Sequence, residues 1–283
     1  MGRDGPWNGD RDRLPRNRTV TFLKKSISQI GIMTNISILM YHQVGVFDRP
    51  AAHRSTYCHI RRFKAQMAYL KYLNYRVISA DEAVAVVQGK QKLDGHAVVL
   101  TFDDGYADFL DTVWPILNRY RFPATVFMVS ALAGKPSSWF EADGRETPPL
   151  LNVEQLRQLR RAGVTIGAHT LSHPRLSRIP REQMTQEIVE SRRQLTEMLE
   201  EDIPYFCYPY GDYDAAVVDA VKDAGFQAAF SCIRGAAVPG DDRFLLPRKA
   251  ISYGDSLAGF WWKLHMKHAK KLPTTSASEK GCC

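Results

Sequence analysis

Short apolar stretches recur along the chain and alternate with segments whose apolar positions have helical spacing. Six of these stretches are rich in β-branched and aromatic residues and predict buried strands: ISILMYHQV (36–44), AVVLTF (97–102), PATVFMVS (123–130), VTIGAH (164–169), the first half of PYFCYPYG (204–211) and FQAAFS (226–231). A shorter strand is expected in YRVIS (75–79). Their apolar side chains are continuous, which is typical of a parallel sheet covered on both faces.

Helices are predicted between the strands. Phe63, Met67 and Leu70 recur at helical intervals within 61–73. Further helices are expected at 108–120, 152–163, 181–200 and 214–225, with Ser79 or Asp81 as the N-cap of one more and Gly163 as a C-cap. The loop 131–151, which contains Trp139, is long enough to line a site. This alternation predicts a single α/β domain over 36–265, with a barrel as the favoured form.

The charge distribution sets the two ends of the chain apart. The 283 residues carry a formal charge of +8, and much of the excess lies in the first 25 residues and after residue 262. Residues 1–35 are expected to form a basic, flexible arm and residues 266–283 a disordered tail. The body has no basic stripe interleaved with aromatic residues, so no specific nucleic-acid partner is expected. Solvated tails are the simplest interpretation, and peripheral membrane contact through them is the alternative.

The cysteines and the N-terminal segment indicate the cellular compartment of the protein. The five cysteines are odd in number and irregularly spaced, which is typical of a reducing compartment. No stretch approaches the roughly 20 apolar residues of a membrane span. The N-terminal apolar segment is interrupted by Lys24 and Lys25, unlike an export signal, although Met33 is an alternative start. The sequence therefore predicts a cytoplasmic protein or one that is peripheral at the inner membrane.

Polar residues stand where predicted strands end, which is where parallel α/β folds place their chemistry. Asp103 and Asp104 are the first such pair, and Gly105 allows the chain to turn sharply after them. Asp-Asp-Gly is also ordinary turn and N-cap chemistry, which is the simpler interpretation for the pair alone. A divalent cation would remove the repulsion between the two acids, with one carboxylate as ligand and the other left as a base.

His169 and His173 follow another strand, four residues apart, and could meet on one face of a helical turn. Two solvent-facing histidines are the alternative, since such pairs are frequent. With one carboxylate they supply three ligands and leave a position for water, as in catalytic zinc sites. The spare carboxylate would take the proton of that water, so the pattern predicts metal-assisted hydrolysis.

The segment FCYPYGDY (206–213) predicts a rigid turn at Pro209 and Gly211. A packed aromatic turn is one interpretation. Alternatively, the backbone N–H of Tyr210 faces a developing oxyanion, and the tyrosine rings pack on sugar rings.

Taken in this order, TFDDGY (101–106), HTLSH (169–173) and YPYG (208–211) resemble the polysaccharide deacetylase family, carbohydrate esterase family 4. LMYHQV (39–44) and the run 63–79 are similar to bacterial members, so the resemblance covers nearly all of 36–250. It implies a distorted (β/α) barrel with about seven parallel strands. It also implies one divalent metal, Zn²⁺ or otherwise Co²⁺, Ni²⁺ or Mn²⁺, and removal of N-acetyl, sometimes O-acetyl, groups from sugars.

The resemblance also implies roles for individual residues. Asp103 would be the catalytic base, and Tyr210 would give its backbone N–H to the oxyanion. Thr170 and Ser172 would at most support the site. The metal ligands would be Asp104, His169 and His173. From their positions in the sequence, and not from the resemblance, His42, Tyr208, Pro209 and Trp139 are expected to line the substrate, with a structural role as the alternative for His42.

Two positions depart from the family pattern. The third motif often begins with an arginine that orients the base; here Cys207 stands in that place, and Arg248 could serve instead. Many members use a late histidine as general acid. The late candidates here, His265 and His268, lie in a predicted amphipathic terminal helix, where a structural or solvated role is expected. The departing amine could then take its proton from His42 or from water.

The sequence therefore predicts a metal-dependent hydrolase that removes N-acetyl groups from an N-acetylated glycan: a polysaccharide, an oligosaccharide or a lipid-linked precursor. Exopolysaccharide synthesis is a setting that suits such an enzyme. A degenerate family member that binds a glycan without turnover is one alternative. An amidohydrolase of a different small amide is the other, because motifs at a metal define only the reaction centre.

Overall fold

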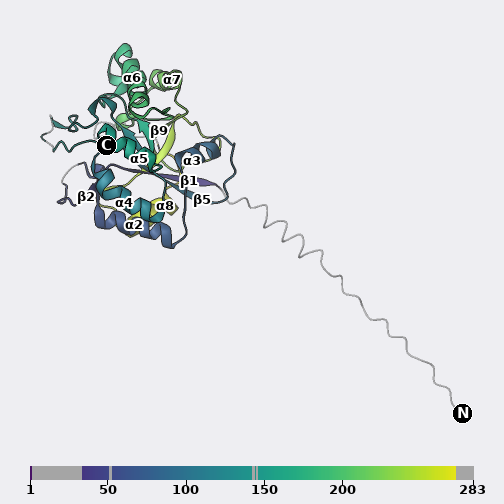
Figure 1. The fold of residues 1–283 in the computed structure, drawn as a ribbon. Coiled ribbons are helices and arrows are strands. Elements are labelled where there is room, and N and C mark those ends of the chain that lie inside the picture. The colour runs from purple at the N-terminus through teal and green to yellow at the C-terminus, as the bar shows by residue number, and fades with distance from the viewer. Residues whose placement is uncertain (2–33, 51–52, 142–143, 145, 272–283) are drawn as a thin grey trace. The chain divides into compact units, whose positions relative to one another are not determined.

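Seven parallel strands close into a barrel in the computed structural model (Figure 1). In spatial order they are β1 (Asn35–Tyr41), β10 (Leu246–Ala250), β9 (Ala228–Arg234), β8 (Tyr205–Cys207), β7 (Thr165–Ala168), β6 (Thr125–Met128) and β5 (His96–Phe102). β1 pairs with β5 along its whole length and closes the ring. The prediction of a (β/α) barrel with about seven parallel strands is confirmed.

The structure describes Met1 and residues 34–50, 53–141, 144 and 146–271. The predicted basic arm (1–35) and disordered tail (266–283) fall largely outside these residues. Both therefore stay predictions. Within the described part, the unit that contains the barrel begins at Thr34.

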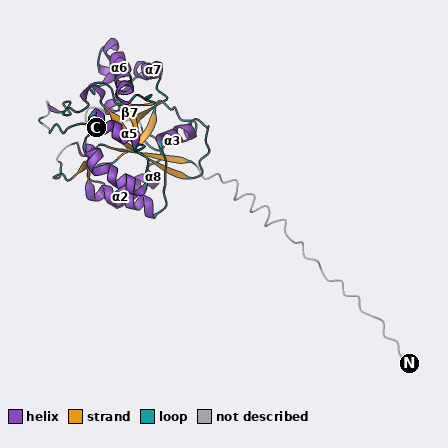
Figure 2. Ribbon diagram, in the orientation of Figure 1, coloured by secondary structure: helices purple, strands orange, loops and turns teal. Residues whose placement is uncertain are grey.

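Helices surround the barrel (Figure 2). They are α2 (Ile60–Tyr72), α3 (Ala80–Val87), α4 (Trp114–Tyr120), α5 (Val153–Arg161), α6 (Arg181–Leu199), α7 (Ala215–Asp223) and α8 (Leu257–Met266). Shorter helical turns are η1 (Arg54–Thr56), η2 (Phe109–Val113), η3 (Ser130–Leu132), η5 (Leu176–Arg178) and η6 (Pro209–Gly211). Ser79 caps α3 in a capping box with Glu82, so the first of its two predicted N-caps is correct.

Alternate positions of the strands pack into two apolar clusters. Leu39 of β1 and Leu100 of β5 join a large cluster with the surrounding helices. Ile38 and Val99, on the opposite face of the same strands, join Phe127 in a second cluster that also contains α3. Because neighbouring positions of a barrel strand face outward and inward in turn, the strand residues of the second cluster fill the barrel interior, and α3 packs against them.

Two features of the strands differ from the prediction. The first predicted strand, 36–44, is interrupted at His42, after which β2 (Gln43–Gly45) pairs with β3 (Tyr57–His59) in a separate sheet. β10 was not predicted, because its sequence LPRKA contains a proline and two cations. β4 (Arg76–Val77) pairs with the start of β5, outside the ring.

None of the helices in the described part of the chain has the length and apolarity needed to cross a membrane.

Candidate active site

The carboxyl ends of five strands contribute the side chains of the candidate site. Asp103 and Asp104 follow β5, and His169 and His173 follow β7. The other three are His42 after β1, Cys207 at the end of β8 and Arg248 within β10. Strand ends that are distant in sequence therefore meet at one end of the barrel, as predicted for a parallel fold.

Asp104 lies between the two histidines. Its Oδ1 atom is 3.4 Å from Nε2 of His169 and 3.4 Å from Nε2 of His173. One ligand atom from each residue can be chosen so that all lie within 4.8 Å of one another. Among the described residues, both carboxylate oxygens of Asp104 and both Nε2 atoms are buried without a hydrogen-bond partner. Buried polar atoms normally have partners, so this triad fits a divalent cation.

The protonation states of the triad suit metal ligands. Burial alone would raise the pKa of Asp104, but His169 and His173 lower it well below its usual range. Burial lowers the pKa of His173 to about 4, against the opposing effect of Asp104. The carboxylate is therefore ionised and this imidazole neutral at neutral pH, which are the forms that bind metal.

Contacts outside the triad orient the first histidine. His169 Nδ1 lies 2.8 Å from the backbone carbonyl oxygen of Cys207. Because a carbonyl can only accept, Nδ1 carries the proton and the lone pair is left on Nε2, which faces Asp104.

The backbone at the site has an unusual conformation. Asp104, Thr170, His173 and Tyr210 all have left-handed φ angles, of 73°, 67°, 68° and 58°. Non-glycine residues with such angles are uncommon and gather at functional sites. The predicted helical turn across His169 and His173 is therefore wrong: the segment is an irregular loop, and its two left-handed residues bring the imidazoles together.

Gly105 is required by space as well as by its φ angle of +75°. A Cβ atom at this position would lie 2.2 Å from Sδ of Met128 and 3.4 Å from its Cα. The sharp turn predicted after Asp104 therefore depends on this glycine.

Glu187 of α6 braces the histidine loop and was not recognised in the sequence. One carboxylate oxygen accepts from the backbone N–H groups of Leu171 and Ser172, each at 2.9 Å, and the other accepts from the Ser172 hydroxyl at 2.6 Å. Thr170 Oγ1 accepts from the backbone N–H of His173 at 3.0 Å. A single acid on a helix face gives no motif, so only the fold reveals this contact.

Asp103 is held by Arg248. The guanidinium donates to both carboxylate oxygens, at 2.7 and 2.8 Å, and to Thr101 Oγ1 at 3.2 Å. Both side chains are fully buried. Burial would raise the pKa of Asp103, but the charge and hydrogen bonds of Arg248 lower it below its usual value. Arg248 is therefore paired with Asp103 and comes from β10, a strand that the sequence did not reveal; its role toward a catalytic base stays a prediction.

Cys207 lies beside this pair, with its sulfur 3.0 Å from Arg248 Nη2 and 3.6 Å from Asp103 Oδ2. Asp103, His169 and Cys207 form a second group with metal-ligand spacing. Two observations favour the Asp104 triad over this group. Asp103 is already paired with Arg248, and burial raises the pKa of the Cys207 thiol well above its usual value.

His42 lies 4.0 Å from the Oδ2 atom of Asp103, measured from Nε2, and is 3% exposed. Neither of its ring nitrogens has a hydrogen-bond partner among the described residues. The break between β1 and β2 places this ring at the barrel end, beside Asp103.

Aromatic rings cover the triad. The Trp139 and Tyr210 rings each lie 4.5 Å from the His173 ring, measured between centroids. Pro209 is buried at the start of the same turn. Tyr208 does not line a site: its ring is fully buried and its hydroxyl donates to the Phe244 carbonyl at 3.0 Å. The prediction for Tyr208 is therefore corrected to a core role.

The late histidines pack at α8. His265 Nε2 lies 2.5 Å from the Tyr75 hydroxyl, and its ring packs on Trp261. His268 Nδ1 lies 3.4 Å from Lys249 Nζ. Both histidines therefore contact neighbouring side chains in the region of α8.

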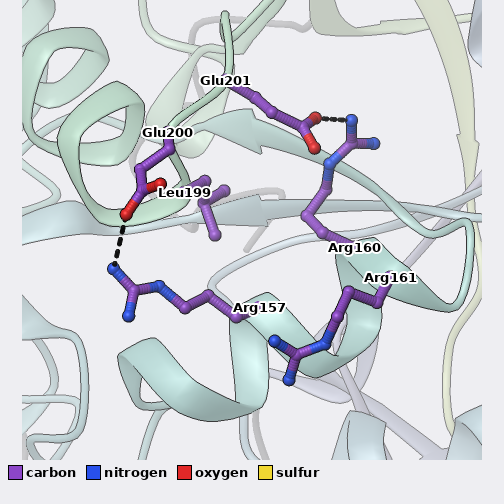
Figure 3. Close-up of a pocket in the computed structure, with 6 residues that line it drawn as sticks. All are labelled: Arg157, Arg160, Arg161, Leu199, Glu200 and Glu201. Atoms are coloured by element: carbon purple, nitrogen blue, oxygen red, sulfur yellow. Dashed lines mark hydrogen bonds and ion pairs between the residues drawn. The ribbon is translucent and has the colours of Figure 1, made fainter.

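A hollow on the molecular surface lies elsewhere, between α5 and the end of α6 (Figure 3). Arg157 and Arg160 reach across it to Glu200 and Glu201, and Arg161 pairs with Glu154. It contains none of the strand-end residues. Exposed ion pairs of this kind contribute little to folding stability. Because none of the candidate residues lines the hollow, it is not a competing catalytic site.

Comparison with known proteins agrees with the geometry. Residues 90–229 match the family model of polysaccharide deacetylases. The chain is 26% identical over 225 residues to YxkH of Bacillus subtilis, whose name describes it as a polysaccharide deacetylase. The match covers 80% of this chain and 74% of YxkH. It is 23% identical over 200 residues to the poly-β-1,6-N-acetyl-D-glucosamine N-deacetylase of Staphylococcus aureus, covering 68% of this chain and 66% of that protein.

Solved structures share the fold. The deacetylase PplD of Streptococcus pyogenes superposes with a TM-score of 0.70 at 22% identity, covering 82% of this chain and 99% of PplD. IcaB from Ammonifex degensii superposes with a TM-score of 0.70 at 22% identity, covering 81% of this chain and 97% of IcaB. At 22% identity, the similarity to these structures supports a shared fold only.

Proposed function

Because the chain carries a domain of the polysaccharide deacetylase family over residues 90–229, we propose that it is a metal-dependent hydrolase that removes N-acetyl groups from amino sugars of a polysaccharide. The observation that carries the proposal is the triad of Asp104, His169 and His173, whose carboxylate oxygens and Nε2 atoms are buried without a hydrogen-bond partner among the described residues, beside the buried carboxylate of Asp103. The name of the staphylococcal relative supports a polymer of N-acetylglucosamine as the substrate.

Asp104, His169 and His173 would hold the cation. A bound divalent cation such as Zn²⁺ supplies a Lewis acid that polarises the amide carbonyl and lowers the pKa of water. Three protein ligands are the number found in catalytic zinc sites, where a further position stays open. Glu187 and the His169–Cys207 contact would fix the ligands in place.

Asp103 acts as the general base that takes the proton of the attacking water. Arg248 holds its carboxylate in one orientation through two hydrogen bonds. The same pairing keeps Asp103 ionised and makes it a weaker base than an unpaired carboxylate. Its contribution therefore rests on fixed position more than on proton affinity.

The charge that develops on the carbonyl oxygen needs a donor, and the backbone N–H of Tyr210 is proposed for this role. The tyrosine lies in the turn against His173, in a left-handed conformation. One oxyanion donor in a buried site can contribute several kcal/mol; removing a side-chain amide donor from a protease costs about 2.7–4 kcal/mol.

His42 is proposed to protonate the departing amine. It is the buried histidine beside the base, and its two ring nitrogens have no other partner among the described residues. Trp139 and Pro209 are proposed to line the sugar.

The experiment is acetate release from N-acetylglucosamine oligomers, comparing β-1,6-linked with β-1,4-linked chains. Wild-type protein is expected to release acetate, and His42→Gln to release it more slowly while binding metal normally. A protein that binds the oligomers and metal but releases no acetate would be a glycan-binding family member. Release from a small acetamide but not from the oligomers would indicate a different amide substrate.

A further inference from the structure

The outer face of α8 is apolar and exposed. Leu257, Trp261, Trp262 and Met266 are 44%, 43%, 49% and 55% exposed. Trp262 and Met266 lie opposite the fully buried Phe260 and Leu264, Trp261 lies at the edge of this exposed side, and Leu257 belongs to the first turn of the helix. A helix that is apolar on both sides normally has both sides covered.

α2 lies beside α8 (Figure 1). The Tyr69 and Phe260 rings pack edge to face at 6.0 Å. Tyr72 and Leu73, at the end of α2, are 74% and 57% exposed. Six of the nine exposed large apolar side chains in the described residues thus come from these two neighbouring segments, which we term the α2–α8 face.

The two segments that form this face also carry many cations. α2 contains four cations and no acid, and residues 257–271 contain four lysines and no acid. The exposed cations of these segments are Arg61, Lys64 and Lys71 of α2, and Lys267, Lys270 and Lys271 after the end of α8. Two acids from nearby loops, Asp255 and Asp241, pair with Lys263 and Lys270 and offset part of this charge.

We propose that the α2–α8 face docks on an anionic lipid membrane. Tryptophan and leucine beside lysine and arginine are the composition of helices that lie in the membrane interface. The tryptophan rings would enter the headgroup region, and each nearby cation would add about 1 kcal/mol of attraction to anionic lipid.

The positive charge of the two segments argues against two other binding partners, a second copy of this chain and the deacetylated glycan. A symmetric dimer through this face would bring two sets of cations together, which opposes association. A deacetylated glycan, the product of the proposed function, is itself cationic and would be repelled. An anionic surface with an apolar layer beneath it satisfies both properties of the face.

The test is co-sedimentation of the full chain with vesicles of phosphatidylcholine alone or of phosphatidylcholine mixed with phosphatidylglycerol. Wild-type protein is expected to bind the mixed vesicles, more weakly as salt rises, and its tryptophan fluorescence is expected to shift to shorter wavelength. Trp261→Ser/Trp262→Ser should lower the partition coefficient by about tenfold or more, given the apolar area removed from the contact. Lys64→Glu/Lys71→Glu should remove the preference for anionic lipid.

Val189→Ser is the matched control, because Val189 is an exposed apolar residue of α6, 42% exposed, and it should bind like wild type. Acetate release from soluble oligomers should be unchanged in the tryptophan variant, so failure of this proposal and failure of the deacetylase proposal are distinguishable. The proposal is overturned if wild-type protein ignores anionic vesicles at low salt, or if the tryptophan variant binds them equally. A dimer in solution that the tryptophan variant abolishes would also overturn it.

Discussion

Replacing Arg248 by methionine removes the cation that holds the proposed base. Arg248→Met keeps an unbranched side chain of similar length in the barrel but loses both hydrogen bonds to Asp103 and the bond from Nε to the Ser231 carbonyl at 2.9 Å. Asp103 is then left as a buried carboxylate without its counter-charge.

The expected loss of folding stability in Arg248→Met is large. Breaking a buried ion pair by removing one partner typically destabilises a protein by about 3–5 kcal/mol, because the remaining charge is buried and uncompensated. Asp103→Asn should also destabilise, since it strands the buried guanidinium. The double variant should cost less than the sum of the two, with a coupling energy above about 1 kcal/mol.

The pH dependence of activity gives a second readout. Arg248 lowers the pKa of Asp103 against the effect of burial, so its loss should raise that pKa. A general base is active only when ionised, and the acid limb of the kcat/KM profile should therefore move to higher pH. Stability contributed by the ion pair is present above the unfolded pKa of an aspartate, about 3.9, and is lost as pH falls through the folded value.

Urea unfolding of the wild type, the two single variants and the double variant measures the coupling, and acetate release across pH measures the base. Additivity of the two single costs within about 0.5 kcal/mol would show that the two side chains do not interact. An unmoved acid limb in Arg248→Met would show that Asp103 is not the base or that Arg248 does not set its pKa.

The remaining predictions concern the metal, the brace and one buried acid. Asp104→Ala should lose bound metal and activity together, by elemental analysis and acetate assay; metal retained at full occupancy would remove Asp104 from the ligand set. Asp103→Asn should keep metal but lose turnover by about 10²–10⁴, the usual contribution of a positioned base, and near-normal rates would refute that role. Glu187→Gln should weaken metal binding by about 10–100-fold in a calorimetric titration, with Glu190→Gln on the same helix as control; equal affinity in both would show that the brace is only structural. Burial raises the pKa of Asp108 to about 7, so stability should fall as pH rises from about 4 to about 7, where only the unfolded state has released this proton. Asp108→Asn should flatten that slope in thermal unfolding scans, and an unchanged slope would assign it to other groups.

Much of the fold could be predicted because its strands are apolar without interruption. Such stretches predict a buried parallel sheet, and six of the seven barrel strands were found in this way. β10 was missed because Arg248 and Lys249 are charged in a buried strand. Their burial depends on two partners from elsewhere in the chain, Asp103 after β5 and Ser37 in β1, which no local pattern encodes.

The site could be predicted at the level of residue types at strand ends. The convergence of Asp104, His169 and His173 follows from the parallel topology. Their actual approach depends on left-handed backbone angles and on the Glu187 brace, which are properties of the folded loop. Tyr208 was misassigned because an aromatic turn has the same sequence whether its rings face the core or the substrate.

The measurement that tests the central claim most directly is acetate release from N-acetylglucosamine oligomers by protein stripped of metal with a chelator, before and after Zn²⁺ is restored. The account predicts no release from the stripped protein, recovery at about one equivalent of metal, and no recovery in Asp104→Ala. Equal release with and without metal, or recovery in Asp104→Ala, would contradict it.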